Sequence, residues 1–201
     1  MQVSALYKNL EKRRKGLEKQ FCGFDQIDSA LPKNQDDLRS FKLLVHAEIE
    51  SYIESAVLKV WEKCNAEWTN NKKVIGTLSF LILFATSKFE ANEKQLEIND
   101  RIDQILESFK KTINNNHGIK KENILKLVIP IGVDYASIDA TWLTTIDSYG
   151  SSRGEVAHKS CAVQKQLDKN DELKTLKLVL NGLKEMDIKI QKLYSIRRKP
   201  F

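Results

Sequence analysis

The chain has few of the residues that interrupt helices. It carries eight glycines and three prolines among 201 residues, about half of the usual share of roughly 12%. This scarcity disfavours collagen-like, linker-rich and many-turned all-β proteins. The longest apolar run, residues 74–85, has 12 residues, whereas a membrane-spanning helix needs roughly 20. The composition therefore predicts long helices and no membrane span.

Cysteine and histidine are also scarce, with three of each. The cysteines lack CxxC spacing and the histidines lack HExxH spacing, so we expect no metal site and no cofactor. An odd number of scattered cysteines fits free thiols in a reducing cytosol. The first residues do not form a secretory signal, and neither a Gly-rich phosphate loop nor a GxSxG elbow is present. We expect a cytoplasmic protein without the apparatus of the common enzyme classes.

Apolar residues recur at helical spacing along most of the chain, which predicts an all-α fold. We expect one domain, 1–201, with an N-terminal helix and loop (1–34), a core bundle (35–195) and a basic tail (196–201). Asn34 is expected to cap the best-defined helix, and the apolar run is expected to form a buried central helix. The predicted helical segments are residues 3–21, 36–61, 74–85, 96–113, 138–149 and 170–193, and residues 121–129 form a further short segment that stops at Pro130.

The formal net charge is +6. It is compatible with a nucleic-acid partner and equally with simple solubility. The first helix carries the basic quartet Lys12, Arg13, Arg14 and Lys15 on its polar side. These side chains either contact a phosphate backbone or form an ordinary solvated face.

The segment SSRGEVAH, residues 151–158, has the composition of a phosphate site. Ser152 and Glu155 have the spacing of a capping box, which predicts that a helix begins here after a break at Gly150, with Arg153 at its first position. A guanidinium, a helix N-terminus and the His158 imidazole each suit a phosphate. The alternative is a packed histidine and a solvated arginine. Positions five apart point about 140° away from each other, so a two-fold dimer would be needed to bring two such segments around one cleft.

The six residues RGEVAH follow the pattern Arg-x-x-x-x-His, with ATWLTTIDSY before them and a long last helix after them. Together with the upstream segments NNNHGIKKENILKLVIPIGVDYASIDATW and HAEIESYIESAVLKVW, they resemble the signature of the HEPN superfamily, particularly its RiboL-PSP-type branch. The resemblance covers about residues 38–195. It implies an HEPN-like helical bundle, here with an extra N-terminal helix, that dimerises and cuts RNA without a metal ion.

The resemblance implies that Arg153 and His158 are the catalytic residues. Many members have Asn or Asp directly after the motif arginine, where this chain has glycine. An acidic residue of the early helix is implied to lie near the site, and the sequence offers three without choosing among them. Lys159 and Arg153 are expected to favour the neutral form of His158. The candidate supporting residues are Glu48, Glu50, Glu54, Gly154 and Lys159.

The function predicted from this resemblance is a metal-independent endoribonuclease that cuts RNA through its own 2′-hydroxyl, in a toxin or defence setting. The expected partners are RNA and a second copy of the chain, and an antitoxin or a nucleotidyltransferase-like protein fits that setting. One alternative is a non-catalytic HEPN-like module that binds nucleotide, RNA or protein. The other is a helical interaction protein in which the motif is accidental.

Overall fold

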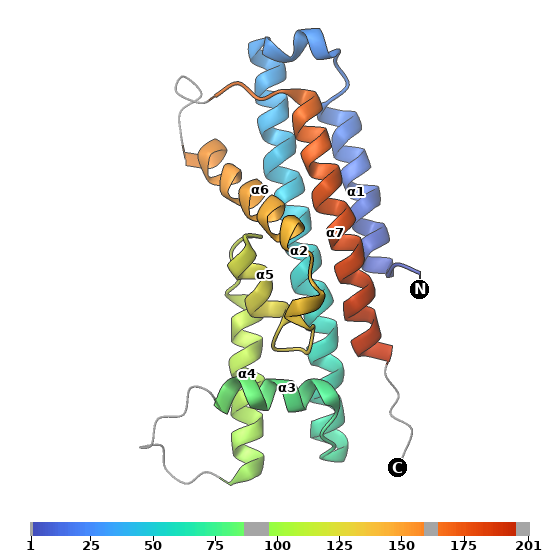
Figure 1. The fold of residues 1–201 in the computed structure, drawn as a ribbon, viewed down its shortest axis with the longest axis vertical. Helices are drawn as coiled ribbons and strands as arrows, with labels where there is room; N and C mark the ends of the chain where they lie inside the picture. The colour runs from blue at the N-terminus through green and yellow to red at the C-terminus, as the bar shows by residue number, and fades with distance from the viewer. Residues whose placement is uncertain (1, 87–96, 159–164, 196–201) are drawn as a thin grey trace.

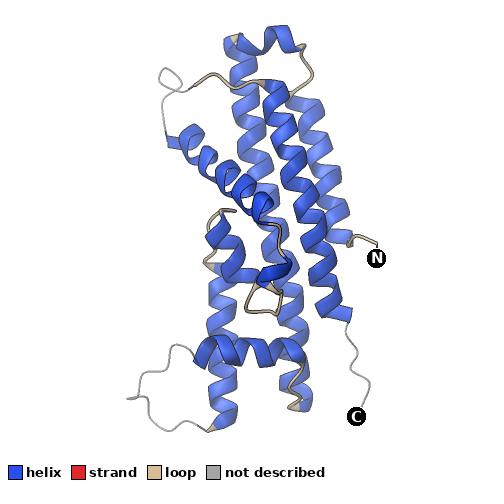
Figure 2. Ribbon diagram, viewed as in Figure 1, coloured by secondary structure: helices blue, strands red, loops and turns tan. Residues whose placement is uncertain are grey.

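The structure is a computed structural model that describes residues 2–86, 97–158 and 165–195. Within these ranges every regular element is a helix (Figures 1 and 2), which confirms the predicted all-α fold. None of these helices has the length and hydropathy of a membrane-spanning segment. The elements are α1 (Ala5–Phe21), the 3₁₀ helix η1 (Gln26–Ala30), α2 (Pro32–Asn71), α3 (Gly76–Thr86), α4 (Ile98–Asn114), α5 (Lys121–Val128), the 3₁₀ helix η2 (Tyr135–Ser137), α6 (Ala140–His158) and α7 (Lys169–Ser195).

The longest element is α2, whose 40 residues give it a length of about 60 Å. The helices α1, α4 and α7 pack along it, α6 crosses it at an angle, and α5 contacts both α2 and α6 (Figure 1). The short helix α3 crosses one end of α2 and packs against α4. Helix α2 therefore carries side chains that face several different neighbours.

The start of α2 differs from the sequence prediction. The loop expected between the first helix and residue 35 contains η1 and the first turn of α2, which begins at Pro32. Proline suits the first helical position because its fixed φ is helical and its missing N–H would have no partner there. Asn34, the expected cap, lies inside the helix, and its Nδ2 donates a hydrogen bond to the Asp28 carbonyl at 2.8 Å.

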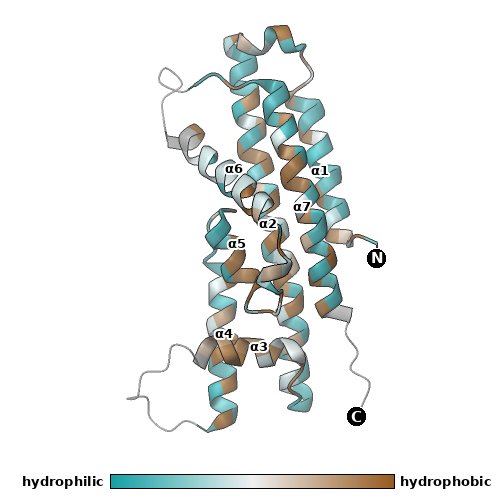
Figure 3. Cartoon of the chain, viewed as in Figure 1, coloured by the Kyte–Doolittle hydropathy of each residue, from teal (hydrophilic) through white to brown (hydrophobic). Residues whose placement is uncertain are grey.

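The hydrophobic core runs along α2 and takes one apolar face from each neighbouring helix (Figure 3). Val45, Ile49 and Val57 of α2 are completely buried. The buried apolar residues of α2 recur at the helical period, because one side of this helix is enclosed along most of its length. The fully buried side chains contributed by other elements include Leu17, Leu106, Ile124, Ile146 and Leu183.

A buried carboxylate ties the start of α1 to α7. Asp187 is 2% exposed, and its two oxygens accept hydrogen bonds from the Ser4 backbone N–H at 2.7 Å, the Ser4 hydroxyl at 2.6 Å and the Tyr52 hydroxyl at 2.9 Å. Ser4 is also the N-cap of α1, where its Oγ accepts from the Tyr7 N–H. This cluster fixes α1 against the bundle because a buried carboxylate must keep its donors.

The apolar run does not form the buried central helix that the sequence predicts. It forms α3, in which Leu78 and Leu81 are buried while Phe80, Leu83 and Phe84 are 43%, 65% and 44% exposed. The face of α3 that meets α2 and α4 is covered, and the Phe80 ring lies against Gly132. The prediction was wrong because apolar composition does not show how many neighbours a helix has.

Helix α6 is continuous, so the predicted break at Gly150 and the capping box at Ser152 were also wrong. The Ser152 hydroxyl donates to the Tyr149 carbonyl at 2.7 Å. Gly150 is needed for a close approach, since a Cβ there would lie 3.1 Å from the Lys120 backbone nitrogen. The N-terminus of α6 is capped much earlier, by Asp139.

Candidate functional site

Three polar residues of α2 lie on one side of the helix, one turn apart: His46, Glu50 and Glu54. His46 is 2% exposed, and its Nδ1 lies 3.7 Å from Glu50 Oε2. Burial lowers the pKa of His46, the Glu50 carboxylate opposes this shift, and the positive charge of Arg153 adds to it. The imidazole is therefore expected to be neutral near pH 7.

The structure separates the three glutamates that the sequence offered. Glu48 lies about 200° around α2 from both His46 and Glu50, and its Oε1 is 2.8 Å from Arg13 Nε of α1. Glu50 and Glu54 instead face the segment that precedes α5. Glu50 is the glutamate beside His46, whereas Glu48 belongs to the contact with α1.

The segment before α5 is fastened to this side of α2 by hydrogen bonds. Glu50 Oε1 accepts from the Gly118 backbone N–H. Asn116 is 4% exposed, and its Nδ2 donates to Glu54 Oε1 at 2.8 Å and to the Gly118 carbonyl at 3.1 Å. Gly118 has φ +114°, a conformation that favours glycine. Burial raises the pKa of Glu54, and the Asn116 hydrogen bond partly opposes that shift.

The same segment is joined to α6. The Lys121 N–H donates to Asp147 Oδ1 at 2.9 Å, and the backbone of Ile119 and Lys120 lies against Gly150. Helices α2 and α6 are therefore held at a fixed spacing by one short segment. Across this spacing the positive charge of Arg153, in the second half of α6, acts on His46.

Arg153 lies about 20 Å along α6 from its start. Its side chain is exposed, and none of the side chains that the structure describes forms a hydrogen bond or ion pair with its guanidinium. Its charge nevertheless reaches His46. Because Arg153 lies within the helix, the expected helix N-terminus is not beside it. A phosphate here would be held by the guanidinium rather than by helix amides.

The other predicted residues have different positions. His158 is the last residue of α6, and its side chain lies outside what the structure describes. Lys159 lies outside the described residues. Gly154 is next to Arg153, and a Cβ at this position would meet nothing within 4 Å.

Sequence reasoning missed His46 and Asn116 as members of this group. The signal for His46 is its spacing of four and eight residues from two glutamates on a predicted helix. Asn116 has no such signal, because its role depends on a contact with Glu54, which is 62 positions away in the sequence.

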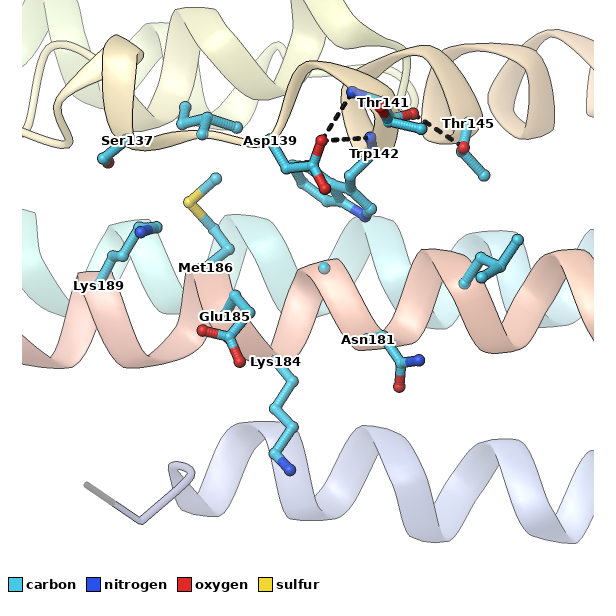
Figure 4. Close-up of a pocket in the computed structure, with 13 residues that line it drawn as sticks. Ser137, Asp139, Thr141, Trp142, Thr145, Asn181, Lys184, Glu185, Met186 and Lys189 are labelled. Carbon is cyan, nitrogen blue, oxygen red and sulfur yellow. Dashed lines mark hydrogen bonds between the residues drawn. The ribbon is translucent and has the colours of Figure 1, made fainter.

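A separate pocket lies between α6 and α7, near the start of α6 (Figure 4). It has a volume of about 530 Å³ and is bordered by Trp142, Lys184 and Glu185. The Trp142 indole donates to the Val179 carbonyl at 3.0 Å and lies where a Cβ on Gly182 would be. Arg153 and His46 do not line it, so this pocket is distinct from the group around the motif.

Comparisons with known proteins agree with the architecture. The sequence model described as RiboL-PSP-HEPN matches residues 8–192. The match extends the resemblance seen in the motifs toward the N-terminus and includes most of α1. No curated protein and no solved structure gives a match. Because the family model covers nearly the whole chain, this protein belongs to the RiboL-PSP-HEPN family.

Proposed function

We propose that this protein is an endoribonuclease in which Arg153 and His158 carry the reaction. The observation that supports the proposal best is the exposed guanidinium of Arg153, which pairs with none of the described carboxylates and whose positive charge acts on the buried His46. An arginine in this state is available to bind a phosphodiester. Membership of a HEPN family makes RNA the substrate to test.

The proposed reaction uses the RNA's own 2′-hydroxyl as nucleophile. This oxygen attacks the adjacent phosphorus and loses its proton, and the bond from phosphorus to the 5′-oxygen of the next nucleotide breaks as that oxygen gains a proton. The products are a 2′,3′-cyclic phosphate and a 5′-hydroxyl. His158 is proposed to move protons, and Arg153 to stabilise the charge that develops on the phosphoryl oxygens.

A homodimer is part of this proposal. Arg153 and His158 point about 140° apart on one helix, so two chains related by a two-fold axis would complete one cleft with residues from both. A toxin or defence role, with an antitoxin or nucleotidyltransferase-like partner that restrains the activity, fits an RNase of this kind. Light scattering that finds a monomer at concentrations giving full activity would contradict the shared cleft.

The second candidate is a non-catalytic module that binds RNA or nucleotide. The observation that favours it is Gly154, which leaves open space directly after the motif arginine, where many members carry a polar side chain. In that case Arg153 would hold a phosphate without turnover. RNA binding by the purified protein without any cleavage would support this candidate over the first.

The test is RNA cleavage by Arg153→Ala and His158→Ala proteins. Each change is expected to reduce the rate by about two orders of magnitude or more, since an electrostatic stabiliser and a general acid–base group each contribute roughly 10² to 10⁴. Circular dichroism checks that the helices remain. Lys111→Ala is the control, because Lys111 is exposed on α4. Full activity of a folded His158→Ala protein, or loss of activity only in the control, would refute the assignment.

A further inference from the structure

The polar side of α1 carries a straight row of lysines. Lys8, Lys12, Lys15 and Lys19 are all exposed. At 100° per residue, these four positions lie within about 60° of one another around the helix axis, and they span about 16 Å along it. We call them the α1 lysine row.

The basic residues of α1 fall into two groups. Arg14 is enclosed and pairs with Glu11 at 3.1 Å and with Glu18, and Arg13 pairs with Glu48 of α2 at 2.8 Å. No lysine of the row forms an ion pair or hydrogen bond with a side chain that the structure describes. The arginines are therefore committed to the fold, whereas the lysine row presents uncompensated charge to solvent.

The opposite side of α1 is packed into the bundle. Tyr7, Leu10 and Leu17 are buried, so α1 has no apolar face left to insert into a lipid surface. A partner of the lysine row must be attracted by charge alone. Four cations at intervals of about 5 to 6 Å along a line suit a chain of phosphates.

The row lies away from the candidate site. Glu48 marks the side of α2 that faces α1, and it is about 200° around the helix from His46 and Glu50. Figure 1 shows α1 and α6 on different sides of α2. A phosphate chain on the row would therefore bind apart from the reacting bond.

We propose that the α1 lysine row is a second contact surface for the sugar–phosphate backbone of single-stranded RNA, independent of base sequence. The choice of RNA rests on the proposed function, while the polyanion chemistry rests on the row itself. The row would hold RNA that flanks the scissile nucleotides, and it would raise affinity without taking part in cleavage.

The experiment compares RNA binding of the wild type with that of the variant Lys8→Gln, Lys12→Gln, Lys15→Gln and Lys19→Gln. Glutamine has nearly the helix propensity of lysine, so α1 should remain intact. The probe is fluorescent single-stranded 2′-O-methyl RNA, which has no free 2′-hydroxyl and therefore reports binding without cleavage. The control variant removes four exposed lysines from other helices and loops: Lys33, Lys59, Lys73 and Lys111.

For a single strand, each lost phosphate contact lowers by about 0.7 the steepness with which the logarithm of the binding constant falls with the logarithm of the salt concentration. Loss of all four contacts should reduce the slope by about 2.8. If the binding constants of the variant and the wild type become equal near 1 M salt, this corresponds to roughly 600-fold weaker binding at 0.1 M. The control variant should keep a slope close to that of the wild type.

Equal salt dependence of RNA binding in the row variant and the wild type would overturn the proposal. So would a control variant whose salt dependence falls as much as that of the row variant. Binding to phosphatidylserine vesicles but not to RNA would also overturn it, because the surface would then serve a membrane. If the wild type fails to cleave unmodified RNA but the row still governs binding, only the proposed function fails. If cleavage occurs and the row variant binds normally, only this inference fails.

Discussion

Replacing Gly150 by alanine is expected to destabilise the protein, whereas the same replacement at Gly154, one turn further along α6, is expected to stabilise it. Both residues lie inside the helix, where alanine is favoured over glycine by about 1 kcal/mol. At Gly154 the new Cβ would meet nothing within 4 Å. The free energy of unfolding of this variant should therefore rise by up to about 1 kcal/mol.

At Gly150 the new Cβ would lie 3.1 Å from the Lys120 nitrogen and 3.3 Å from the Ile119 carbonyl carbon. Both are backbone atoms. Their segment is held by the Gly118 hydrogen bond to Glu50 and the Lys121 hydrogen bond to Asp147, so it cannot move away without disturbing the site. Overpacking of this kind costs about 1 to 3 kcal/mol. The net effect expected is a loss of about 1 kcal/mol, since the helical preference for alanine offsets part of the cost.

Thermal and urea unfolding followed by circular dichroism would measure both variants. A difference of about 2 kcal/mol between them corresponds to roughly 4 to 8 °C in Tm for a chain of this size. Because helix propensity changes equally in the two variants, their difference isolates the packing at Gly150. The same stability change in both variants would show that the close approach of α6 to the segment before α5 is wrong.

Three further predictions concern the buried polar groups. Arg153→Ala should raise the pKa of His46, measured by NMR titration, because the positive charge of Arg153 lowers it. In the wild type, the free energy of unfolding should fall as the pH drops below about 6.5, because the unfolded chain then binds the proton more readily than the folded protein. Asn116→Ala should cost about 1 to 3 kcal/mol in urea unfolding and raise the pKa of Glu54, which loses a donor. Asp187→Ala should cost about 3 kcal/mol or more by leaving its buried donors unpaired, and a loss under 1 kcal/mol would contradict the assigned hydrogen bonds.

Helical periodicity was sufficient to predict the fold class, because burial of one face leaves a regular pattern along the chain. The stripe of α2 and the face of α4 follow that pattern. Predictions from local sequence were wrong where a contact with a segment distant in the sequence determines the structure. Gly150 reads as a helix break in the sequence, yet glycine is required there because backbone from another segment comes within contact distance.

For the candidate site, the sequence supplies residue types and spacings, and the catalytic roles remain a prediction. The pattern Arg-x-x-x-x-His locates Arg153 and His158, and helix geometry places Glu50 and Glu54 on one side of α2. Which side of α2 faces α1 could not be read from the sequence, and the Arg13–Glu48 ion pair shows that it is the side that carries Glu48. The contribution of Asn116 depends entirely on tertiary contact.

The most direct test of the proposed activity is an analysis of the RNA ends after cleavage in excess chelator. The mechanism predicts that cleavage continues, that the 5′ fragment ends in a 2′,3′-cyclic phosphate, and that the other fragment begins with a 5′-hydroxyl. An RNA with a single 2′-deoxy substitution at the cut site should resist. Loss of all cleavage in chelator with rescue by Mg²⁺ or Mn²⁺, or equal cleavage of the deoxy-substituted RNA, would contradict the mechanism.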